Sequence, residues 1–416
     1  MSLRPVTDEP DCSEMTMRIL MISDVYFPRI NGVSTSIQIF IQALQRRGHS
    51  VTLIAPDYGD NNDSSTEIIR VPSRKLIVDP EDRMMNMRWV MNRLEQLRRN
   101  HYDLIHVQTP FVAHYLGLKL ARQLQLPVVE TYHTYFEEYL YNYITWLPRT
   151  ALRLGARIFS RSQCNGVGHV IVPSAPIEQA LRNYGVVTPM TIVPTGLELE
   201  KFSAGDGQRF RARYGIPMER PMALYVGRMV HEKNIRFLLQ AMHRAITGMP
   251  ELLFVMAGEG PAETWARRWV ELNGLQNNVL FVGYLQRETT LLDCYRAADV
   301  FVFASRTETQ GLVLLEAMAV GTPVVSTAVL GTKTVLSHGH GALIAREDEQ
   351  DFSDKVLRLL RDETARKTLS KSALNHAREW SIDNMIERKL AVYSSIIEEN
   401  TKQPSRLLGK SFSMID

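Results

Sequence analysis

The stretch DVFVFASRTETQGLVLLEAMAVGTPVVSTA, residues 299–328, holds two short apolar runs separated by a polar loop and a glycine-opened apolar segment. DVFVFAS and TPVVSTA are short, apolar and rich in Val and Phe, as buried strands are, whereas GLVLLEAMAVG favours a helix. A strand, a helix and a second strand in this order form a parallel βαβ unit. The stretch therefore predicts one repeat of a parallel sheet covered by helices.

The same alternation runs along most of the chain. Runs that we expect as strands buried on both faces are RILMIS, SVTLIAP, DLIHVQ, LPVVET, HVIVPS and MTIVPTG, then PMALYVGR, LLFVMAG, NVLFVGY, DVFVFAS and TPVVSTA. Between the two groups lies PTGLELEKFSAGDGQRF, a Gly- and charge-rich pause that predicts a linker near residues 195–215.

The length of 416 residues fits two or three domains at about 150 residues each. We predict an α/β fold of two doubly wound, Rossmann-like domains that face each other across a cleft. The expected divisions are a disordered extension (1–16), an N-terminal domain (17–195), a C-terminal domain (196–380), a terminal helix (381–400) and a tail (401–416).

Composition excludes several classes of protein. The net charge of +3 gives no field that would attract nucleic acid. Three widely separated cysteines show neither metal nor redox spacing, which fits a reducing cytoplasm. The N-terminus has no signal-peptide pattern, and no apolar run approaches the roughly 18–20 residues of a spanning helix. We expect a cytoplasmic protein without a spanning segment, which leaves open that it lies on a membrane.

In open parallel sheets, ligands bind beyond the carboxyl ends of the strands, so the residues after each run are the candidates. Asn31 and Gly32 follow the first run, where a glycine lets amide groups approach an anion; a plain turn is the alternative. Arg228 and Lys233 follow PMALYV and suit a diphosphate, against the alternative of two solvated charges.

Two carboxylates flank the glycine of SRTETQGLVLLEA, residues 305–317. Glu308 is expected in the loop and Glu316 on the helix about two turns in, with the amides of Gly311 and Leu312 free at the helix start. If wholly helical, the separation would be about 12 Å, comparable with the span from a ribose to a hexose across a diphosphate. The alternative makes Glu316 the partner of a neighbouring arginine.

His133, in VVETYHTYFEEYL, is expected at a strand end facing the cleft, unless it is an ordinary structural histidine. Metal ligands are not evident, because the chain has no Asp-x-Asp pair and because His338 and His340 lack a partner cluster. There is also no G-x-S-x-G elbow, no G-x-x-x-x-G-K phosphate loop and no dinucleotide fingerprint.

Taken together, these motifs resemble glycosyltransferase family 4, whose members are retaining enzymes with the GT-B fold. The resemblance covers roughly residues 17–395 and rests on five motifs in the family's order: NGVSTSI, YHT, YVGRMVHEKN, FVGYL and SRTETQGLVLLEAMAVGTPVVST. It implies a donor-binding C-terminal domain, an acceptor-side N-terminal domain and a final helix that crosses back.

The resemblance also implies a role for each matching residue. Catalytic roles fall to His133, Arg228, Lys233 and Glu308, and donor-binding roles to Gly32, Val282, Tyr284, Leu285, Gly311, Leu312 and Glu316. Glu316 would hold the ribose, the residues from Val282 to Leu285 would edge the base, and Glu308 would bind sugar hydroxyls. The implied reaction needs no metal or cofactor and proceeds by same-face displacement to an α-linkage.

A basic, aromatic segment follows His133. Arg149, Arg153, Arg157 and Arg161 recur every four residues without an acid among them, and Trp146 closes a run of aromatic residues. Leu154 and Ile158 fall on the opposite side of the expected helix. Such a segment suits an anionic lipid surface. The alternative is an amphipathic helix packed on its own sheet.

YHTYFEEYLYNY and TETQGL further resemble diacylglycerol α-glucosyltransferases. That resemblance implies a UDP-hexose donor such as UDP-glucose, a lipid acceptor and a peripheral place on the inner face of the cytoplasmic membrane. Three alternatives remain open: a soluble or polysaccharide acceptor, a non-catalytic nucleotide-sugar-binding protein, and a dinucleotide oxidoreductase, which would lack its glycine fingerprint.

Overall fold

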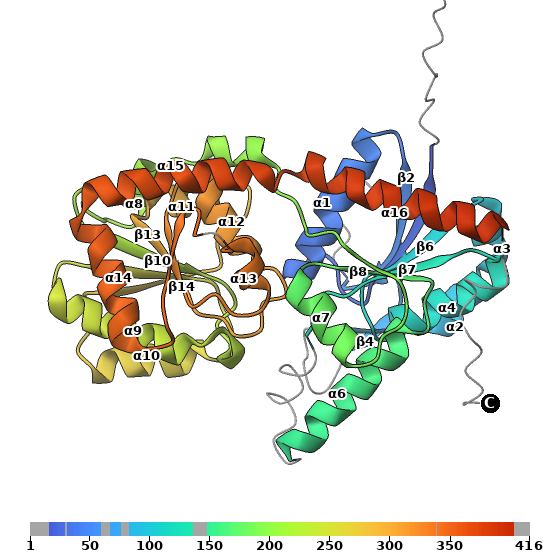
Figure 1. The fold of residues 1–416 in the computed structure, drawn as a ribbon, viewed down its shortest axis with the longest axis horizontal. Helices are drawn as coiled ribbons and strands as arrows, with labels where there is room; N and C mark the ends of the chain where they lie inside the picture. The colour runs from blue at the N-terminus through green and yellow to red at the C-terminus, as the bar shows by residue number, and fades with distance from the viewer. Residues whose placement is uncertain are drawn as a thin grey trace, which may run out of the picture.

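The computed structural model describes residues 16–29, 31–59, 67–75, 83–135, 148–337 and 339–402. Within them the chain forms two parallel sheets, each flanked by helices, in two domains that lie side by side (Figure 1). This arrangement confirms the predicted α/β class. The expected extension and tail lie almost entirely outside the described residues.

The first sheet has the strand order β3-β2-β1-β6-β7-β8-β9, all parallel. Its strands are β1 (Arg18–Ile22), β2 (Ser50–Pro56), β3 (Glu67–Val71), β6 (Leu104–Val107), β7 (Val128–Thr131), β8 (His169–Val172) and β9 (Met190–Ile192). A hairpin of β4 (Ser73–Lys75) and β5 (Arg83–Met85) lies beside it. The strand order reverses at β1, which is where such sheets bind ligands.

The second sheet repeats this topology with the order β12-β11-β10-β13-β14-β15. Its strands are β10 (Met222–Val226), β11 (Leu253–Ala257), β12 (Val279–Gly283), β13 (Val300–Phe303), β14 (Val324–Ser326) and β15 (Ala342–Ile344). The order reverses at β10, so that the loops after β10 and β13 begin beside each other.

Helices connect the strands of both domains. Those of the first domain are α1 (Gly32–Arg46), α2 (Met87–Met91), α3 (Leu94–Arg99), α4 (Val112–Leu124), α6 (Arg149–Cys164) and α7 (Ala175–Asn183). The second domain holds the short turns η1 (Leu199–Ala204) and η2 (His231–Lys233), with α8 (Gly207–Arg213), α9 (Ile235–Gly248), α10 (Glu263–Leu272), α11 (Thr290–Ala297), α12 (Leu312–Ala319), α13 (Gly331–Val335), α14 (Glu349–Arg361) and α15 (Glu363–Glu379).

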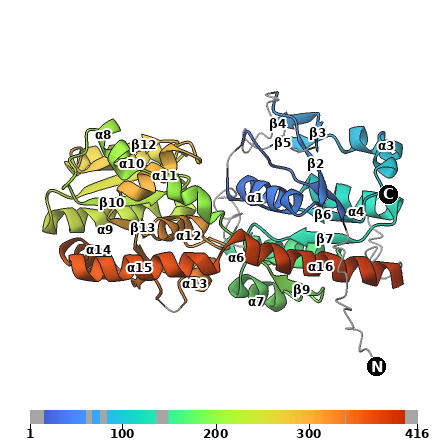
Figure 2. The same cartoon turned by 90° about the horizontal axis from the view of Figure 1, so that it is seen from above.

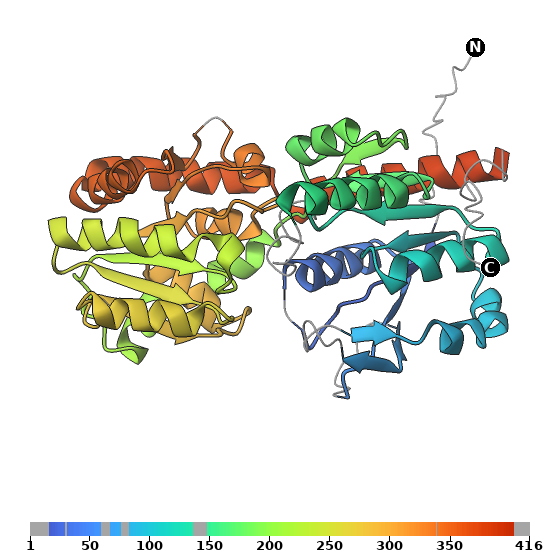
Figure 3. The ribbon, with the colours of Figure 1, turned by 90° about the horizontal axis from the view of Figure 1, so that it is seen from below.

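The last described helix, α16 (Ile382–Lys402), belongs by its packing to the first domain (Figure 2). Met385, Ile386, Tyr393 and Ile396 join the core that α1 forms against one face of the first sheet. Seen from below, the orange-red helices α14 to α16 run along one side of both domains (Figure 3). The apolar stripe of α16 therefore ties the end of the chain to its beginning.

The chain passes between the domains at two adjacent points. Leu197 N donates to Trp380 O at 2.7 Å, and Ile382 N donates to Leu197 O at 2.8 Å. A Cβ on Gly196 would lie 2.5 Å from Ile382 Cα, so the close approach of the two segments requires glycine at this position. The two crossings thus form one hydrogen-bonded unit.

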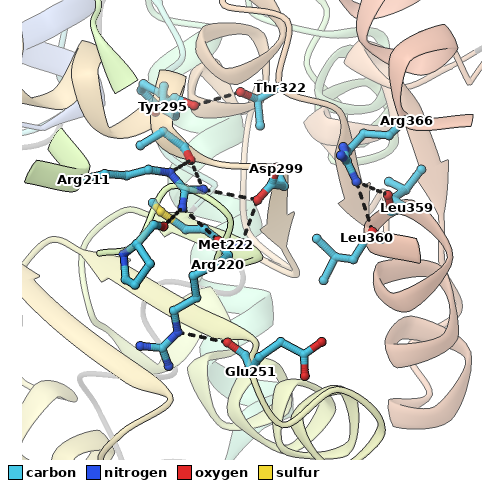
Figure 4. A network of polar contacts seen from close by, with 12 residues as sticks. Arg211, Arg220, Met222, Glu251, Tyr295, Asp299, Thr322, Leu359, Leu360 and Arg366 are labelled. Carbon is cyan, nitrogen blue, oxygen red and sulfur yellow. Dashed lines mark hydrogen bonds and ion pairs between the residues drawn. The ribbon is translucent and has the colours of Figure 1, made fainter. Parts of the chain in front are cut away.

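The segment expected as a linker is largely structured. Arg211 of α8 donates to the carbonyl oxygens of Pro217 and Arg220, both at 2.8 Å, and its guanidinium also contacts Asp299 at 3.3 Å (Figure 4). Asp299 in turn accepts from Met222 N at 2.9 Å. Residues 199–213 therefore belong to the second domain, and the linker is much shorter than the sequence suggests.

Two other expectations are wrong in part. β9 and β12 are edge strands and are only partly buried, because no neighbouring strand covers one side. In addition, β3, the β4–β5 hairpin and β15 were not predicted from the sequence. β3 carries a charged residue at each end of its short apolar core, and the other three are only three residues long.

Candidate active site

The candidate residues of both domains meet where the two sheets' carboxyl edges face each other. The loop after β13 contacts the ends of strands of the first domain. Thr309 Oγ1 donates to His133 O at 3.2 Å, and Ser174 Oγ donates to Thr309 O at 2.8 Å. His133 follows β7 and Ser174 follows β8, so strand ends of one domain hold a loop of the other.

The first element at this junction is the start of α1. Asn31 caps the helix through Oδ1, which accepts from Val33 N and Ser34 N, and Ser34 Oγ accepts from Asn31 N. This capping box stabilises the turn that the sequence left open. A Cβ on Gly32 would meet no atom within 4 Å, so packing within the protein does not require glycine there.

Lys233 and Glu308 form an ion pair, each with 20% of its side chain exposed. Lys233 ends the short turn η2 and is separated from α9 by Asn234, whose φ is +58°. Lys233 therefore lies just before α9, because the left-handed backbone of Asn234 separates the short turn from the helix. Arg228 lies close to the end of β10, partly buried, and its carbonyl accepts from Tyr225 Oη at 3.0 Å.

Glu316 is buried, with 1% of its surface exposed, and both carboxylate oxygens have partners. Oε1 pairs with Arg287, and Oε2 accepts from Tyr295 Oη at 2.8 Å. The structure thus shows the alternative arrangement, in which Glu316 pairs with an arginine, Arg287.

Glu316 also lines a cavity between the two domains. The cavity is bounded by α1, the first crossing, η1, α11 and α12, and its volume is about 50 Å³. Thr35 and Gln38 of α1 face Arg287, Tyr295 and Glu316 across it. The buried carboxylate of Glu316 therefore stands at the wall of a small cavity between the domains, with Arg287 as its ion-pair partner.

The helix that carries Glu316 begins later than expected. α12 starts at Leu312, after Gly311 with φ +94°, so Glu316 is its fifth residue. Glu316 therefore lies little more than one turn into the helix rather than two, and the segment between the carboxylates is only partly helical. Gly311 has the left-handed backbone that redirects the chain into the helix.

The side chain of His133 contacts Gln108, the residue directly after β6. His133 Nε2 and Gln108 Oε1 lie 3.1 Å apart, and because a carboxamide oxygen only accepts, Nε2 carries the proton. Burial, and to a smaller extent the charge of Lys389, lowers the pKa of His133 to about 3. The imidazole is therefore neutral at physiological pH, with Nδ1 able to accept a hydrogen bond.

The residues expected at a nucleotide base span the end of β12 and the loop after it. Val282 is partly buried, Leu285 is buried, and Tyr284 is 47% exposed. Tyr284 N donates to Glu259 Oε1 at 3.2 Å, so one of the backbone groups assigned to the base already has a partner. The segment borders the second sheet's outer edge next to Arg287.

Several residues of this site were missed in the sequence. Gln108, Arg287 and Tyr295 each contact a candidate residue, and Gln310 joins the two domains. Arg287 lies two residues after Leu285 in the FVGYLQR stretch, so proximity to a motif was the available signal. Tyr295 lies in the middle of α11, and no motif beside it in the sequence indicated a role in the site.

The basic segment is only partly described: Trp146 and the side chain of Arg149 lie outside the described residues. In α6, Arg153, Arg157 and Arg161 are exposed. Leu154 and Ile158 are also exposed, at 60% and 59%, whereas the side facing the domain is formed by Leu152, Ala156 and Ser160. α6 therefore packs on its own domain, as the alternative expected, but through Leu152, Ala156 and Ser160 rather than through Leu154 and Ile158.

None of the helices in the described residues is both long and apolar enough to cross a membrane. In that part of the chain, no three His, Cys, Asp or Glu side chains gather as metal ligands would.

The geometry now has a counterpart in known proteins. Residues 30–201 match the model of Glycosyltransferase Family 4, and residues 206–376 match that of Glycosyl transferases group 1. Two parallel-sheet domains with charged residues at their facing edges define a glycosyltransferase of the GT-B fold. The chain belongs to glycosyltransferase family 4.

Three individual proteins illustrate the similarity. The chain is 34% identical over 318 residues to alpha-monoglucosyldiacylglycerol synthase of Streptococcus pneumoniae, covering 74% of this chain and 71% of that one. It is 26% identical over 401 residues to the protein of the same name from Acholeplasma laidlawii, covering 93% and 99%. The crystal structure of Anabaena HepE with UDP-glucose shares the fold, with a TM-score of 0.72 and 17% identity over 91% of this chain and all of that one.

Proposed function

We propose that this glycosyltransferase moves a hexose from UDP-glucose, or a related UDP-hexose, to a membrane lipid such as diacylglycerol, forming an α-glycosidic bond. The observation that carries the donor half is the ion pair of Lys233 with Glu308 in the loop that leads into α12, the helix whose Glu316 lines an interdomain cavity. A cation, a sugar-binding carboxylate and a ribose-binding carboxylate in one interdomain site match the three parts of a nucleotide sugar.

The nucleoside would enter the cavity between α1 and α12. Glu316 would accept hydrogen bonds from the ribose hydroxyls, for which Arg287 would have to share or give up its contact. The segment from Val282 to Leu285 would border the base. A buried carboxylate that exchanges one set of charged or polar donors for another loses little solvation when the ligand binds.

The diphosphate would lie between the two sheet edges. Arg228, Lys233 and the amides of Gly311 and Leu312 would stabilise the charge that develops on the leaving phosphate as the glycosidic bond breaks. The open space at Gly32 supports close approach of a phosphate to the start of α1. Preorganised donors of this kind stabilise the transition state more than the bound substrate.

The sugar would lie against His133 and Glu308. The neutral imidazole would accept a hydrogen bond from a sugar hydroxyl at Nδ1, because Gln108 occupies Nε2. Glu308 would bind further hydroxyls, and no carboxylate of the set stands out as a nucleophile. We therefore propose a same-face displacement with retention, in which the leaving phosphate helps to deprotonate the acceptor, without metal or cofactor.

The lipid half of the proposal rests on α6 and on the relatives' names. Arg153, Arg157 and Arg161 share the exposed surface of α6 with Leu154 and Ile158. Exposed arginines beside exposed aliphatic side chains suit the interface of an anionic bilayer, where the aliphatic groups enter the acyl boundary. The enzyme would work at the inner face of the cytoplasmic membrane.

The test is a screen of UDP- and GDP-sugars against a lipid extract, followed by mass analysis of the products and NMR of the anomeric proton. We expect a hexosylated diacylglycerol from a UDP-hexose, with an α-anomeric coupling. Transfer only to a water-soluble acceptor would refute the lipid half and leave the donor half standing. No transfer from any nucleotide sugar, with no binding of UDP or GDP, would refute both.

A further inference from the structure

Gln310, directly before Gly311, makes an unusual contact with the main chain of the first crossing. Its Oε1 accepts from Thr195 N at 2.7 Å, and its Nε2 donates to Thr195 O at 2.7 Å. Because Thr195 offers one donor and one acceptor, the orientation of the carboxamide is determined. Gln310 is buried, with 5% of its surface exposed, so both bonds are shielded from water.

The contact continues into the first domain. The hydroxyl groups of Thr195 and Ser36 lie 2.6 Å apart, and both residues are buried. Ser36 lies in the first turns of α1, shortly after Gly32. A continuous hydrogen-bonded path therefore joins the loop of the second domain, the crossing and the helix that opens the first domain's side of the site.

The other side of the loop is held by α13. Gly331 N donates to Glu308 O at 2.9 Å, and a Cβ on Gly331 would lie 2.0 Å from Thr309 O. The loop from Glu308 to Gly311 is thus enclosed between α13 of its own domain and strand ends and a crossing of the other. Its conformation depends on both.

The hydrogen bonds between Gln310 and Thr195 are strong enough to affect the free energy of domain docking. A neutral hydrogen bond contributes about 0.5–1.5 kcal/mol net, whereas leaving a buried donor or acceptor without a partner costs about 1–3 kcal/mol. If the second domain moved away from the crossing, Thr195 and Gln310 would together lose two bonds. Domain interfaces within one chain are commonly small enough to open, so these bonds bear on the balance.

We propose that Gln310 is a positioning residue that couples the docking of the second domain on the crossing to the geometry of the Glu308–Gly311 loop. The sugar and phosphate end of the donor site is then complete only when the domains are docked. The inference rests on the proposed function for the identity of the ligand, but the coupling itself concerns contacts within the chain.

Two variants separate the hydrogen bonds from packing. Gln310→Met keeps the length of the side chain and removes both bonds. Gln310→Glu keeps an acceptor for Thr195 N but faces Thr195 O with a second acceptor until the introduced carboxyl is protonated. Gln350→Met is the matched control, because Gln350 is exposed on α14, far along the chain from the crossing.

The first measurement is hydrogen–deuterium exchange without ligand, followed by mass spectrometry. In Gln310→Met we expect faster exchange in peptides that contain Thr195 and Gly331, whose amides bond to Gln310 and to Glu308 O. Gln310→Glu should show the same loss at neutral pH and regain protection on acidification, when the carboxyl can donate to Thr195 O. Wild-type exchange in both peptides of Gln310→Met would overturn the proposal.

The second measurement is turnover at a temperature where every variant is folded. We expect kcat of Gln310→Met to fall by about tenfold or more, since small displacements of positioning groups cost rate steeply, while UDP affinity changes much less. Altered exchange with wild-type kcat would reduce Gln310 to a structural role and overturn the coupling. If the wild type itself neither binds UDP nor transfers a hexose, the proposed function fails, and exchange at Gly331 decides the coupling alone.

Discussion

Lys233 and Glu308 form an ion pair between the loops that follow β10 and β13, the neighbouring strands at which the second sheet reverses its order. The pair brings a cation assigned to the diphosphate against a carboxylate assigned to the sugar. Each group can hold the other in place until a ligand with both parts competes for them.

Replacing Lys233 by Ala should lower kcat/KM by about 10²-fold, because one charge-assisted contact to the developing phosphate charge is lost. Steady-state kinetics measure the effect. Lys355→Ala is the control, since Lys355 pairs with Asp351 in the same i,i+4 manner as ordinary surface ion pairs. Turnover of Lys233→Ala within a factor of about two of the control would contradict the assignment.

Replacing Glu316 and replacing Glu308 should have different effects on kcat, KM and UDP binding. Glu316→Gln weakens contacts to the non-reacting ribose, so KM should rise more than kcat falls, and calorimetric titration should show roughly tenfold weaker UDP binding. Glu308→Gln should lower kcat and leave UDP binding nearly unchanged, because UDP has no hexose. Equal losses of UDP affinity would contradict this division.

Tyr295→Phe controls for the buried network around Glu316. It removes the hydroxyl that donates to Glu316 at 2.8 Å and leaves the ion pair with Arg287 in place. If Tyr295→Phe weakens UDP binding as much as Glu316→Gln, the loss reflects disturbed packing rather than a ribose contact.

Reversing charge on α6 should weaken binding to anionic vesicles. Each of Arg153→Glu and Arg157→Glu should lower the partition coefficient by several-fold, since a cation near such a surface contributes about 1 kcal/mol. Sedimentation with phosphatidylglycerol vesicles at two salt concentrations measures this, and the wild type should release at high salt. Arg378→Glu, on the exposed face of α15, is the control. The same loss in all three variants would point to net charge alone.

Gly196→Ala should destabilise the protein by about 1–3 kcal/mol, because the added methyl group would meet the main chain of Ile382 at 2.5 Å. Urea unfolding measures the change. Gly155→Ala is the matched control: its Cβ would meet nothing within 4 Å, and alanine in the middle of α6 should stabilise by up to about 1 kcal/mol. Equal stabilities of the two variants would show that the crossings can separate at little cost.

Asp24 predicts a pH dependence of stability. Its carboxylate is buried beneath the start of α4, where it accepts from Thr109 Oγ1 at 2.8 Å and from Ala113 N at 3.1 Å. Burial raises the pKa of Asp24 to about 7 from 3.8, although these hydrogen bonds oppose the shift. The folded state therefore holds the proton more tightly than the unfolded chain does.

The stabilisation is fully present below pH 3.8 and is lost as the pH rises to about 7. Asp24→Asn cannot ionise, so its stability relative to the wild type should improve across this window, by an amount of the order of a few kcal/mol. Urea unfolding at several pH values measures the difference, with exposed Asp354→Asn as the control. A constant difference for Asp24→Asn across the window would contradict the raised pKa.

Much of the site follows from the order of residues along the chain. Alternating strand and helix runs imply parallel sheets, and the carboxyl ends of parallel strands share one edge. His133, Arg228 and Glu308 each follow a strand, so their placement at the carboxyl edges of the two sheets could be predicted from local pattern alone. The resemblance to family 4 implied a role for each of these residues, but it did not predict which side chains they contact.

The sequence by itself determined the two-domain α/β architecture and the loops that carry the candidate chemistry, because strand and helix periodicity and chain order are local properties. Only the tertiary structure decided which side chains become partners. Gln310 meets Thr195 across 115 residues, and Lys389 of α16 is buried over the ring of Phe40, 3.3 Å from its centroid. Such pairings depend on how helices and domains pack in space, and packing joins residues whose separation in sequence carries no signal of their contact.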